Sequence, residues 1–496
     1  MPVIKPTQVQ IPNIPPMIQL HNYQQFCKDF ALTHPYCGLF LRMGLGKTLI
    51  TLETLYELNP HCHVLIIAPK TIARCTWQNE INKWNMPFRT KSLVVNEREK
   101  DLSKKKREEI YDSIPNNPYA TIYFINRDII PSLVKRFPGN QWPFPIVIID
   151  ESQSFKSHSS QRFKSLASVR PYIQRLIELT GSPAPNGLMD LWAQIYLLDM
   201  GQRLGRNITT YRNNYFDPGL MKDGYPITWR LKKYLVDSRG FPMVDAKGQL
   251  KQAKDVIYEQ ISDIVISMDN SFITLPPISY HDVDVILTPD ELDTYKQFAK
   301  SSVLELTDGT IIEAKNAAIL ASKLVQIASG SIYTNPAKHE YQVIHENKLE
   351  MCEYIINNFD SNMLIAYHFQ SEKDMLLKYF AKRKIPAVCF DGSAEMQKNW
   401  NNKQYPVMLL QPASCGFGVN LQQGGHGLIW YTIPYSLEEY EQTIARIYRQ
   451  GQTDPTAVFH LLAKQTSDKR LLAVMTNKDA TQKDLLKAVQ VSVDEL

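Results

Sequence analysis

The chain has 496 residues, of which 44% are hydrophobic and 21% charged, and its formal net charge is +5. This length and composition predict a globular, multidomain protein with a large core. No stretch approaches the ~20 consecutive apolar residues of a membrane span, and the N-terminal MPVIKPTQVQIPNIPP lacks a signal-peptide apolar core. We therefore expect a cytoplasmic protein without membrane segments. The seven cysteines are scattered without a Cys-x-x-Cys pair, which favours free thiols in a reducing compartment.

The first chemical signature is FLRMGLGKT, residues 40–48. A phosphate-binding loop needs small residues, so that backbone N–H groups can approach the oxygens, a Lys for the β and γ phosphates and a hydroxyl for Mg²⁺. Gly44, Gly46, Lys47 and Thr48 supply these groups, and an apolar helix-forming segment follows. The Gly expected five positions before the Lys is missing, and Arg42 stands inside the loop. A chance Gly-rich turn is the alternative.

Short runs rich in Val and Ile recur along the chain, each followed by a segment of helical character, which is typical of strand-helix units in a parallel sheet. The first set lies at 64–69, 121–126, 146–150 and 175–181, and the second at 362–367, 387–392, 407–412, 427–434 and 457–463. The sequence therefore predicts an α/β fold with two lobes, each containing a parallel sheet flanked by helices.

An acidic pair ends the third run of the first set, about a hundred residues after the loop. Asp150 would hold Mg²⁺ together with the Thr48 hydroxyl, while Glu151 would orient and activate water, as phosphoryl transfer requires. Taken alone, Asp-Glu after a strand often marks only a helix start. The pairing with Lys47 favours the catalytic interpretation.

The middle of the chain has a different composition. Residues 201–254 contain eleven Lys and Arg against four Asp, interspersed with Tyr and Trp, and 200–280 is poor in strand-like runs. Such a segment could hold a polyanion, and a solvated surface insertion is the alternative. We place lobe one at 1–200, a basic, partly helical insertion at 201–280, lobe two at 281–480 and a C-terminal tail at 481–496.

Near the other end, SLEEYEQTIARIYRQGQ at 436–452 begins with a possible capping box, so we expect a helix there. Helical spacing would put Gln442, Arg446 and Arg449 on one face. Two such arginines could be solvated, or they could reach a γ-phosphate from the second lobe and stabilise charge in the transition state. The spacing before Gly451-Gln452 favours the second interpretation.

At this point the order of motifs resembles superfamily two helicases, and specifically the Swi/Snf-type (sucrose non-fermenting) DNA translocase ATPases, from about residue 18 to 470. LHNYQQ is similar to the adenine-reading motif, with Gln24 as its glutamine, and MGLGKT is similar to the family's phosphate loop. IIAPKTIARCTWQNEINKW, DESQ and LTGSPAPN match the next motifs. CFDGS, ASCGFGVNLQQG and QTIARIYRQGQ match those of the second lobe.

Three departures stand out. Leu41 and Arg42 replace the Asp-Glu that usually precedes the phosphate loop, Gln153 replaces the His of the acidic box, and Tyr448 replaces a His between the arginines. Because Gln keeps a hydrogen-bonding side chain in the acidic box, we expect altered coupling rather than loss of hydrolysis.

The resemblance implies two RecA-like lobes with ATP and Mg²⁺ between them and duplex DNA tracked across both. It implies Gln24, Gln153, Gly418 and Gln442 as further nucleotide-binding residues, and Lys70, Thr71, Ser414 and Asn420 as DNA contacts by motif position. It favours DNA binding by the insertion.

The leading hypothesis is an ATP-dependent translocase, a monomeric motor that remodels protein-DNA complexes or branched DNA in a bacterial or viral setting. A strand-separating DNA or RNA helicase and a DNA clamp that has lost hydrolysis are the alternatives. Protein partners are unknown.

Overall fold

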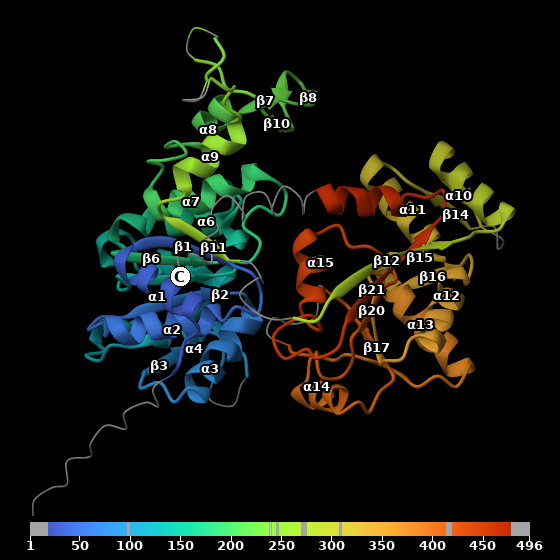
Figure 1. Cartoon of the computed structure of the whole chain (residues 1–496), viewed down its shortest axis with the longest axis horizontal. Coiled ribbons are helices and arrows are strands. Elements are labelled where there is room, and N and C mark those ends of the chain that lie inside the picture. The colour runs from blue at the N-terminus through green and yellow to red at the C-terminus, as the bar shows by residue number, and fades with distance from the viewer. Residues whose placement is uncertain are drawn as a thin grey trace, which may run out of the picture.

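The computed structural model describes residues 18–96, 100–237, 239, 241–244, 248–268, 275–306, 310–412 and 419–477. These residues form two lobes, each built on a parallel β-sheet with buried apolar side chains on both faces, and Figure 1 shows the lobes side by side. The predicted α/β fold with two parallel sheets is confirmed. Within the described ranges, no helix combines the length and apolar character needed to cross a bilayer.

The sheet of lobe one has seven strands in the order β11-β1-β6-β5-β2-β4-β3, and every neighbouring pair is parallel. The strands are β1 (Tyr36–Leu41), β2 (Val64–Ala68), β3 (Thr90–Ser92), β4 (Ile122–Asn126), β5 (Ile146–Asp150), β6 (Arg175–Leu179) and β11 (Val265–Met268). The helices are α1 (Asn22–Thr33), α2 (Lys47–Leu58), α3 (Trp77–Lys83), α4 (Lys104–Ser113), α5 (Ile130–Arg136), α6 (Gln161–Val169), α7 (Leu191–Asp199), α8 (Ile208–Tyr215) and α9 (Ala253–Ile261). Since helices cover both faces, the central strands are almost wholly apolar.

All four strands predicted in this part of the chain are present as β2, β4, β5 and β6. The strand that leads into the phosphate loop, β1, was not predicted, because a Cys and a Gly interrupt its apolar run and the loop motif begins within it. The short β3 and the four-residue β11 also escaped prediction.

Strand β11 changes the limits of the expected insertion. It lies inside the range 201–280, yet it pairs in parallel with β1 and so forms the edge of the lobe-one sheet, next to the strand that carries the phosphate loop. Helix α9, which precedes it, packs Ile257 and Ile261 into the lobe-one core. Because α9 and β11 both belong to lobe one, we propose that the insertion ends before α9. Residue 280 is also too late as a boundary, since β12 of the second sheet begins at Ile278.

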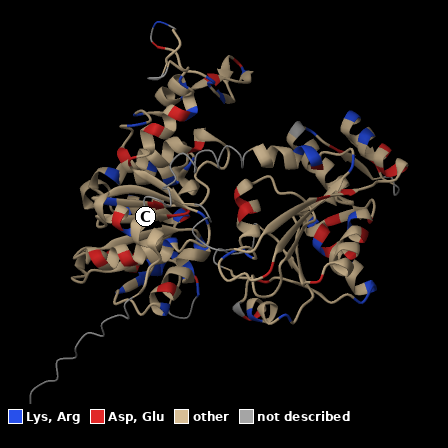
Figure 2. Ribbon diagram, viewed as in Figure 1, with Lys and Arg blue, Asp and Glu red and all other residues tan. Residues whose placement is uncertain are grey.

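The remaining part of the insertion joins the lobe-one core at its base, where Tyr211 and Leu235 are buried, and its far end is drawn at the top of Figure 1 and, with charged residues coloured, of Figure 2. We call residues 201–250 the protrusion. Besides α8 it contains two antiparallel pairs, β7 (Phe216–Pro218) with β10 (Trp229–Leu231) and β8 (Met221–Lys222) with β9 (Tyr225–Pro226). Apolar side chains near its tip are exposed, for example Tyr225 at 75% and Leu220 at 67%.

The sheet of lobe two has six strands in the order β12-β21-β20-β17-β19-β18, again all parallel. They are β12 (Ile278–Val285), β17 (Met363–Ala366), β18 (Ala387–Cys389), β19 (Val407–Leu410), β20 (Gly427–Trp430) and β21 (Thr456–Ala463). The helices are α10 (Pro289–Ser301), α11 (Ala317–Ala328), α12 (Asn347–Asn358), α13 (Gln370–Lys382), α14 (Ala394–Asn401) and α15 (Leu437–Ile444). Two hairpins, β13 (Val303–Glu305) with β14 (Ile311–Glu313) and β15 (Ser331–Asn335) with β16 (Glu340–Val343), complete the lobe. All five strands predicted here are present.

Candidate active site

The phosphate loop connects β1 to α2 through two residues in the left-handed region. Gly44 has φ +88° and Gly46, the N-cap of α2, has φ +77°, so a side chain at either position would strain the loop. Lys47 begins the helix, and its Nζ donates to the carbonyl of Leu41 at 2.8 Å. The free N–H groups at the start of the 12-residue α2 suit an anion.

Gln24 lies against this loop from α1, as the resemblance implied. Its side-chain carbonyl accepts from the backbone N–H of His21 at 3.0 Å, and its Nε2 lies 3.5 Å from the carbonyl of Leu45. A Cβ added to Gly46 would stand 2.5 Å from the same Nε2. The glycine therefore allows the loop and the buried glutamine to approach each other.

The acidic pair lies at the C-terminal end of β5, beside the loop. Asp150 and Glu151 are both buried, and the indole N–H of Trp77 donates to Asp150 Oδ2 at 3.0 Å. Burial, and then the neighbouring Glu151, raises the pKa of the Asp150 carboxyl, whereas Lys47 opposes this shift. Burial likewise raises the pKa of Glu151, against the effect of Lys47. Both shifts reflect the free-energy cost of ionising two carboxyls in a buried site, a cost that a divalent cation would offset.

Glu151 itself has an unusual backbone conformation, with φ +55° in the left-handed region. For a residue other than glycine this costs on the order of 1–3 kcal/mol, and such strain gathers at functional sites. The backbone turns here from β5 into a short 3₁₀ helix, Ser152–Phe155.

Mg²⁺ takes oxygen ligands, and the hydroxyl of Thr48 and the carboxylate of Asp150 are of the kind that would hold it beside bound phosphates. The Thr48 hydroxyl makes no hydrogen bond to any described residue, and Asp150 has a second carboxylate oxygen beyond the one held by Trp77. Within the described ranges, no group of three or more His, Cys, Asp or Glu could hold a metal ion. Mg²⁺ bound with a nucleotide needs no such group, because phosphates and water supply most of its ligands.

Gln153 links the acidic pair to the other lobe. Its Nε2 donates to Glu151 Oε2 at 2.7 Å and to Glu438 Oε1, on α15 of lobe two, at 3.0 Å. Its Oε1 accepts from the Thr180 hydroxyl at 2.6 Å. Gln153 is 1% exposed, and both the nitrogen and the oxygen of its amide are hydrogen-bonded.

The arginine segment of lobe two differs from the helix expected there. Ser436 caps α15 by accepting from the N–H of Glu439 at 3.3 Å, which is one of the two bonds of the predicted capping box, but the helix ends at Ile444. Arg446 and Arg449 therefore lie in the turns that follow, and the helical face predicted for them is wrong. The carbonyl of Arg446 accepts from the N–H of Leu421 at 2.9 Å instead of continuing the helix.

Arg449 nevertheless lies at the phosphate loop, and the positive charge of Arg446 opposes the rise in the pKa of Glu151. A Cβ added to Gly44 would stand 3.8 Å from Arg449 Cβ and from the backbone N of Gln450. Arg446 donates to the carbonyl of Val419 at 3.3 Å, and Arg449 donates to the Asn420 side chain. Burial lowers the pKa of Arg449 to about 10, and the charge of Arg446 adds to the shift. Burial also lowers the pKa of Lys47.

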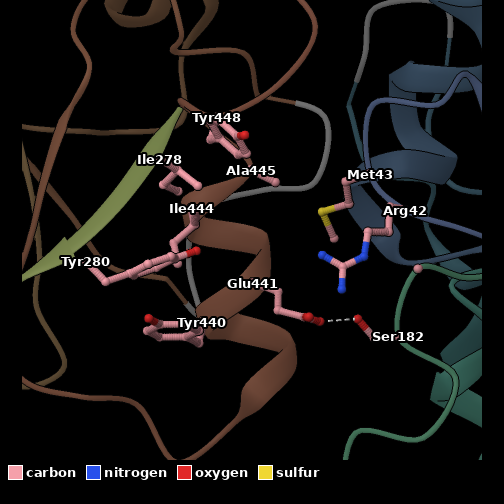
Figure 3. Close-up of a pocket in the computed structure, with 11 residues that line it drawn as sticks. Arg42, Met43, Ser182, Ile278, Tyr280, Tyr440, Glu441, Ile444, Ala445 and Tyr448 are labelled. Carbon is pink, nitrogen blue, oxygen red and sulfur yellow. Dashed lines mark hydrogen bonds between the residues drawn. The ribbon is translucent and has the colours of Figure 1, made fainter. Parts of the chain in front are cut away.

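A cavity of about 360 Å³ lies between the lobes beside this site (Figure 3). It is lined by Arg42, Met43, Gly181 and Ser182 from lobe one and by Ile278, Tyr280, Tyr440, Glu441, Ile444, Ala445 and Tyr448 from lobe two. Across it, the Ser182 hydroxyl donates to Glu441 Oε2 at 2.6 Å. Two of the departures noted in the sequence, Arg42 and Tyr448, therefore lie at the lobe interface.

The structure brings most of the predicted nucleotide residues together: Gln24, Gly44, Gly46, Lys47, Thr48, Asp150, Glu151, Gln153, Gln442, Arg446 and Arg449. Gly418 and Ser414 lie outside the described residues. Lys70 and Thr71 lie just beyond β2, where Lys70 pairs with Asp101 at 2.6 Å in an exposed position. Asn420 holds Arg449 rather than standing free, so its expected contact with DNA stays a prediction.

Several side chains of the site had no predicted role. Trp77 was noted only as part of a motif, and Thr180, Ser182, Glu438 and Glu441 were not singled out. The available signal was the spacing of Glu438 and Glu441, three residues apart on one helical face ahead of the arginines. Their partners lie more than two hundred and fifty positions away in the sequence, which no local pattern encodes.

Comparison with known proteins finds a match to the family model of the SNF2-related domain over residues 30–328. The chain is 31% identical over 494 residues to protein p41 of Acyrthosiphon pisum secondary endosymbiont phage 1, covering 94% of this chain and 98% of that protein. It is 22% identical to a DNA repair and recombination protein RAD54-like of Gallus gallus, covering 90% of this chain but 63% of that protein. A solved SWI2/SNF2 ATPase core of Sulfolobus solfataricus in complex with dsDNA aligns over 95% of this chain and 93% of its own, with 19% identity and a TM-score of 0.41.

Proposed function

The chain belongs to the SNF2-related family of ATPases, and on this basis we propose that it hydrolyses ATP between its lobes to move along double-stranded DNA. One observation carries the proposal: Lys47, Asp150 and Glu151 of lobe one meet the arginine segment of lobe two at the phosphate loop. When ATP is hydrolysed between two lobes, the contacts that hold the lobes together change, and the lobes can move relative to each other.

Each residue has a chemical role in this proposal. The loop N–H groups and Lys47 bind the β and γ phosphates, which requires the ammonium to exchange the Leu41 carbonyl for a phosphate oxygen. Gln24, which lies against the loop, would read the adenine, as the resemblance implies. Thr48 and Asp150 would hold Mg²⁺, which neutralises phosphate charge when it is bound.

Glu151 orients a water molecule and accepts its proton as the water oxygen attacks the γ-phosphorus. The bond from that phosphorus to the bridging oxygen breaks, and ADP leaves with the electron pair. Arg446 and Arg449 stabilise the negative charge of the transition state from the opposite lobe. Once phosphate leaves, these cations lose their shared anion and the lobes can separate.

The DNA part of the proposal rests on charge and on the relatives. Phosphate contacts suit a motor that must move independently of sequence, since base contacts would bind it to particular sites. The basic protrusion, Lys70, Thr71 and the segment around Asn420 are the proposed contacts, with protein-DNA complexes or branched DNA as substrates. Similarity to a DNA repair and recombination protein supports action on DNA, and similarity to a phage protein supports a bacterial or viral setting.

The test is the rate of ATP hydrolysis with duplex DNA, single-stranded DNA, RNA or no nucleic acid. We expect stimulation by duplex DNA, loss of activity by about 100-fold or more in Lys47→Ala, and wild-type activity in the exposed control Lys105→Ala. Triplex displacement then measures movement. Stimulation by single strands or RNA alone would favour a strand-separating helicase, and absence of hydrolysis throughout would favour a clamp; either result refutes the proposal.

A further inference from the structure

Helix α15 is fastened to lobe two through a chain of three side chains. The Tyr440 hydroxyl lies 2.8 Å from His460 Nε2 on β21, and His460 Nδ1 lies 2.7 Å from Asp282 on β12. Tyr440 also stacks on Trp430 of β20, with ring centroids 5.2 Å apart. Because three strands of one sheet hold the helix, its side chains move with lobe two.

Two carboxylates of this helix reach lobe one. Glu438 Oε1 accepts from Gln153 Nε2 at 3.0 Å, and Glu441 Oε2 accepts from the Ser182 hydroxyl at 2.6 Å. Figure 3 shows the second contact across the interlobe cavity, with the Arg42 side chain extending toward Glu441. Two contacts about one helical turn apart fix both the distance of α15 from lobe one and its rotation.

The Gln153 amide is the side chain through which the first contact reaches the acidic pair. An amide nitrogen has two hydrogens, and here one goes to Glu151 and the other to Glu438. Its oxygen is held by Thr180, whose own hydroxyl oxygen accepts from the N–H of Ser182 at 3.0 Å. Both amide hydrogens are therefore satisfied only while lobe two is closed on lobe one.

We infer that Glu438 is a positioning residue for hydrolysis: by accepting from Gln153 across the closed cleft, it holds the amide that in turn orients the Glu151 carboxylate. The inference rests on the proposed role of Glu151. When the lobes separate, Gln153 loses one of its three partners and is free to rotate away from Glu151. Closure of the lobes and the orientation of the Glu151 carboxylate are thereby coupled through the Gln153 side chain.

The acceptor on Glu438 makes this testable. Gln153 and Gln442 both donate to the same oxygen, Oε1, at 3.0 and 3.1 Å. The carbonyl oxygen of a glutamine can accept both bonds, so Glu438→Gln should keep the geometry while losing the charge. Glu438→Ala removes the acceptor altogether. Glu439 is a matched control, because it lies on the same turn and has no side-chain partner in lobe one among the described residues.

The experiment measures kcat and the KM for ATP with duplex DNA. We expect Glu438→Ala to lower kcat by about tenfold with KM changed less than about twofold, and Glu438→Gln and Glu439→Ala to stay within about twofold of wild type. A kcat in Glu438→Ala within twofold of wild type, or a rate in Glu438→Gln as low as in the alanine variant, overturns the inference.

Hydrogen exchange separates this inference from the proposed function, because it requires no hydrolysis. The N–H groups of Ser154 and Lys156 donate to the carbonyls of Glu151 and Gln153 at 3.0 and 3.2 Å, so their exchange reports the stability of this turn. We expect about fivefold faster exchange in Glu438→Ala and wild-type exchange in Glu438→Gln. Unchanged exchange in the alanine variant contradicts the positioning role even if wild-type protein proves inactive toward ATP.

Discussion

The cleft and the protrusion are built in opposite ways. In the cleft, polar side chains such as Gln153, Glu151 and Arg446 are buried, and each has its hydrogen-bonding partners within the chain. In the protrusion, strands of two or three residues leave apolar and basic side chains in solvent, Phe241 being 66% exposed. A dense buried network fixes geometry, whereas an exposed surface offers contacts to another molecule. Substitutions should therefore change the rate of catalysis in the cleft and the affinity for DNA in the protrusion.

The largest effect should come from the arginines that enter the cleft. Arg446→Ala or Arg449→Ala removes a cation from the transition state, and we expect kcat for ATP hydrolysis to fall by about 10³-fold, as for other arginine fingers. Arg470, an exposed arginine of the same lobe, provides the control Arg470→Ala, which should retain wild-type kcat. If kcat falls by less than tenfold in both cleft variants, Arg446 and Arg449 have no catalytic role.

The indole that holds the acidic pair should have the next largest effect. Trp77→Phe keeps a buried aromatic ring but removes the N–H that donates to Asp150 at 3.0 Å, and a hydrogen bond to a charged group contributes about 1.5–3 kcal/mol. We expect kcat to fall by at least about tenfold. Trp84→Phe removes the same kind of bond, from an indole to Glu80 at 2.8 Å, outside the acidic pair. Equal losses in the two variants would mean that the bond to Asp150 has no special role.

Charge removal in the protrusion should act on DNA binding alone. Lys222, Arg230 and Lys233 are exposed there, and replacing all three by Gln should weaken duplex binding by about tenfold near 0.1 M salt and flatten its salt dependence. At saturating DNA, kcat should stay within about twofold of wild type, because the cleft is unchanged. Fluorescence anisotropy over a range of salt concentrations measures both quantities.

The control for this variant replaces three exposed lysines of lobe two, Lys300, Lys338 and Lys382, by Gln. It changes the net charge by the same amount away from the protrusion. If it weakens DNA binding as much as the protrusion variant does, the protrusion has no particular part in binding, and the solvated-surface interpretation holds.

The smallest effect concerns the scaffold beneath the cleft. Glu178 of β6 is fully buried, and burial raises the pKa of its carboxyl well above 4.5, although Ser152 and Arg170 oppose the shift. The folded state keeps a proton that the unfolded state releases, so wild-type stability should fall as pH rises from the unfolded to the folded pKa. Glu178→Gln cannot titrate at this position. The melting temperature of the variant minus that of wild type should therefore increase by about 2–4 °C from pH 5 to pH 8.

Thermal unfolding at both pH values measures this difference. The exposed carboxylate of Glu395 provides the control, since Glu395→Gln should follow the wild-type trend with pH. Parallel curves for wild type and Glu178→Gln would show that the buried carboxyl does not contribute to the pH dependence of stability.

Much of the fold could be predicted because buried parallel strands leave a strong local signal. Continuous apolar runs such as 146–150 and 407–410 are buried on both faces of a sheet, and they can be recognised as strands without knowledge of their neighbours. The four residues of β11 form a strand only because β1 offers an unpaired edge after the chain returns from the protrusion. That pairing depends on the tertiary structure. No local pattern predicted the strand, because the surrounding segment is basic and poor in apolar runs.

The site divides in the same way. Lys47, Asp150 and Glu151 could be predicted, because the loop and the strand end that position them are local. The approach of Arg449 to the phosphate loop was predicted, but the helix expected to contain Arg446 and Arg449 ends at Ile444, and the carbonyl of Arg446 accepts from Leu421 instead. The bonds of Glu438 and Glu441 to lobe one depend on how the lobes meet, and no periodicity in the sequence contains that information.

The place of β11 at the edge of the first sheet has a consequence for synthesis of the chain. Strand β1 pairs with β6 on one side and with β11 on the other. The ribosome finishes β6 at Leu179, but it synthesises β11, Val265–Met268, much later. Throughout the intervening translation, the strand that leads into the phosphate loop presents open N–H and C=O groups to solvent, where they can pair with other nascent chains. A fragment that stops before β11 should therefore aggregate more readily than the same fragment extended through Met268, because the four-residue β11 then replaces the six-residue β1 as the edge strand.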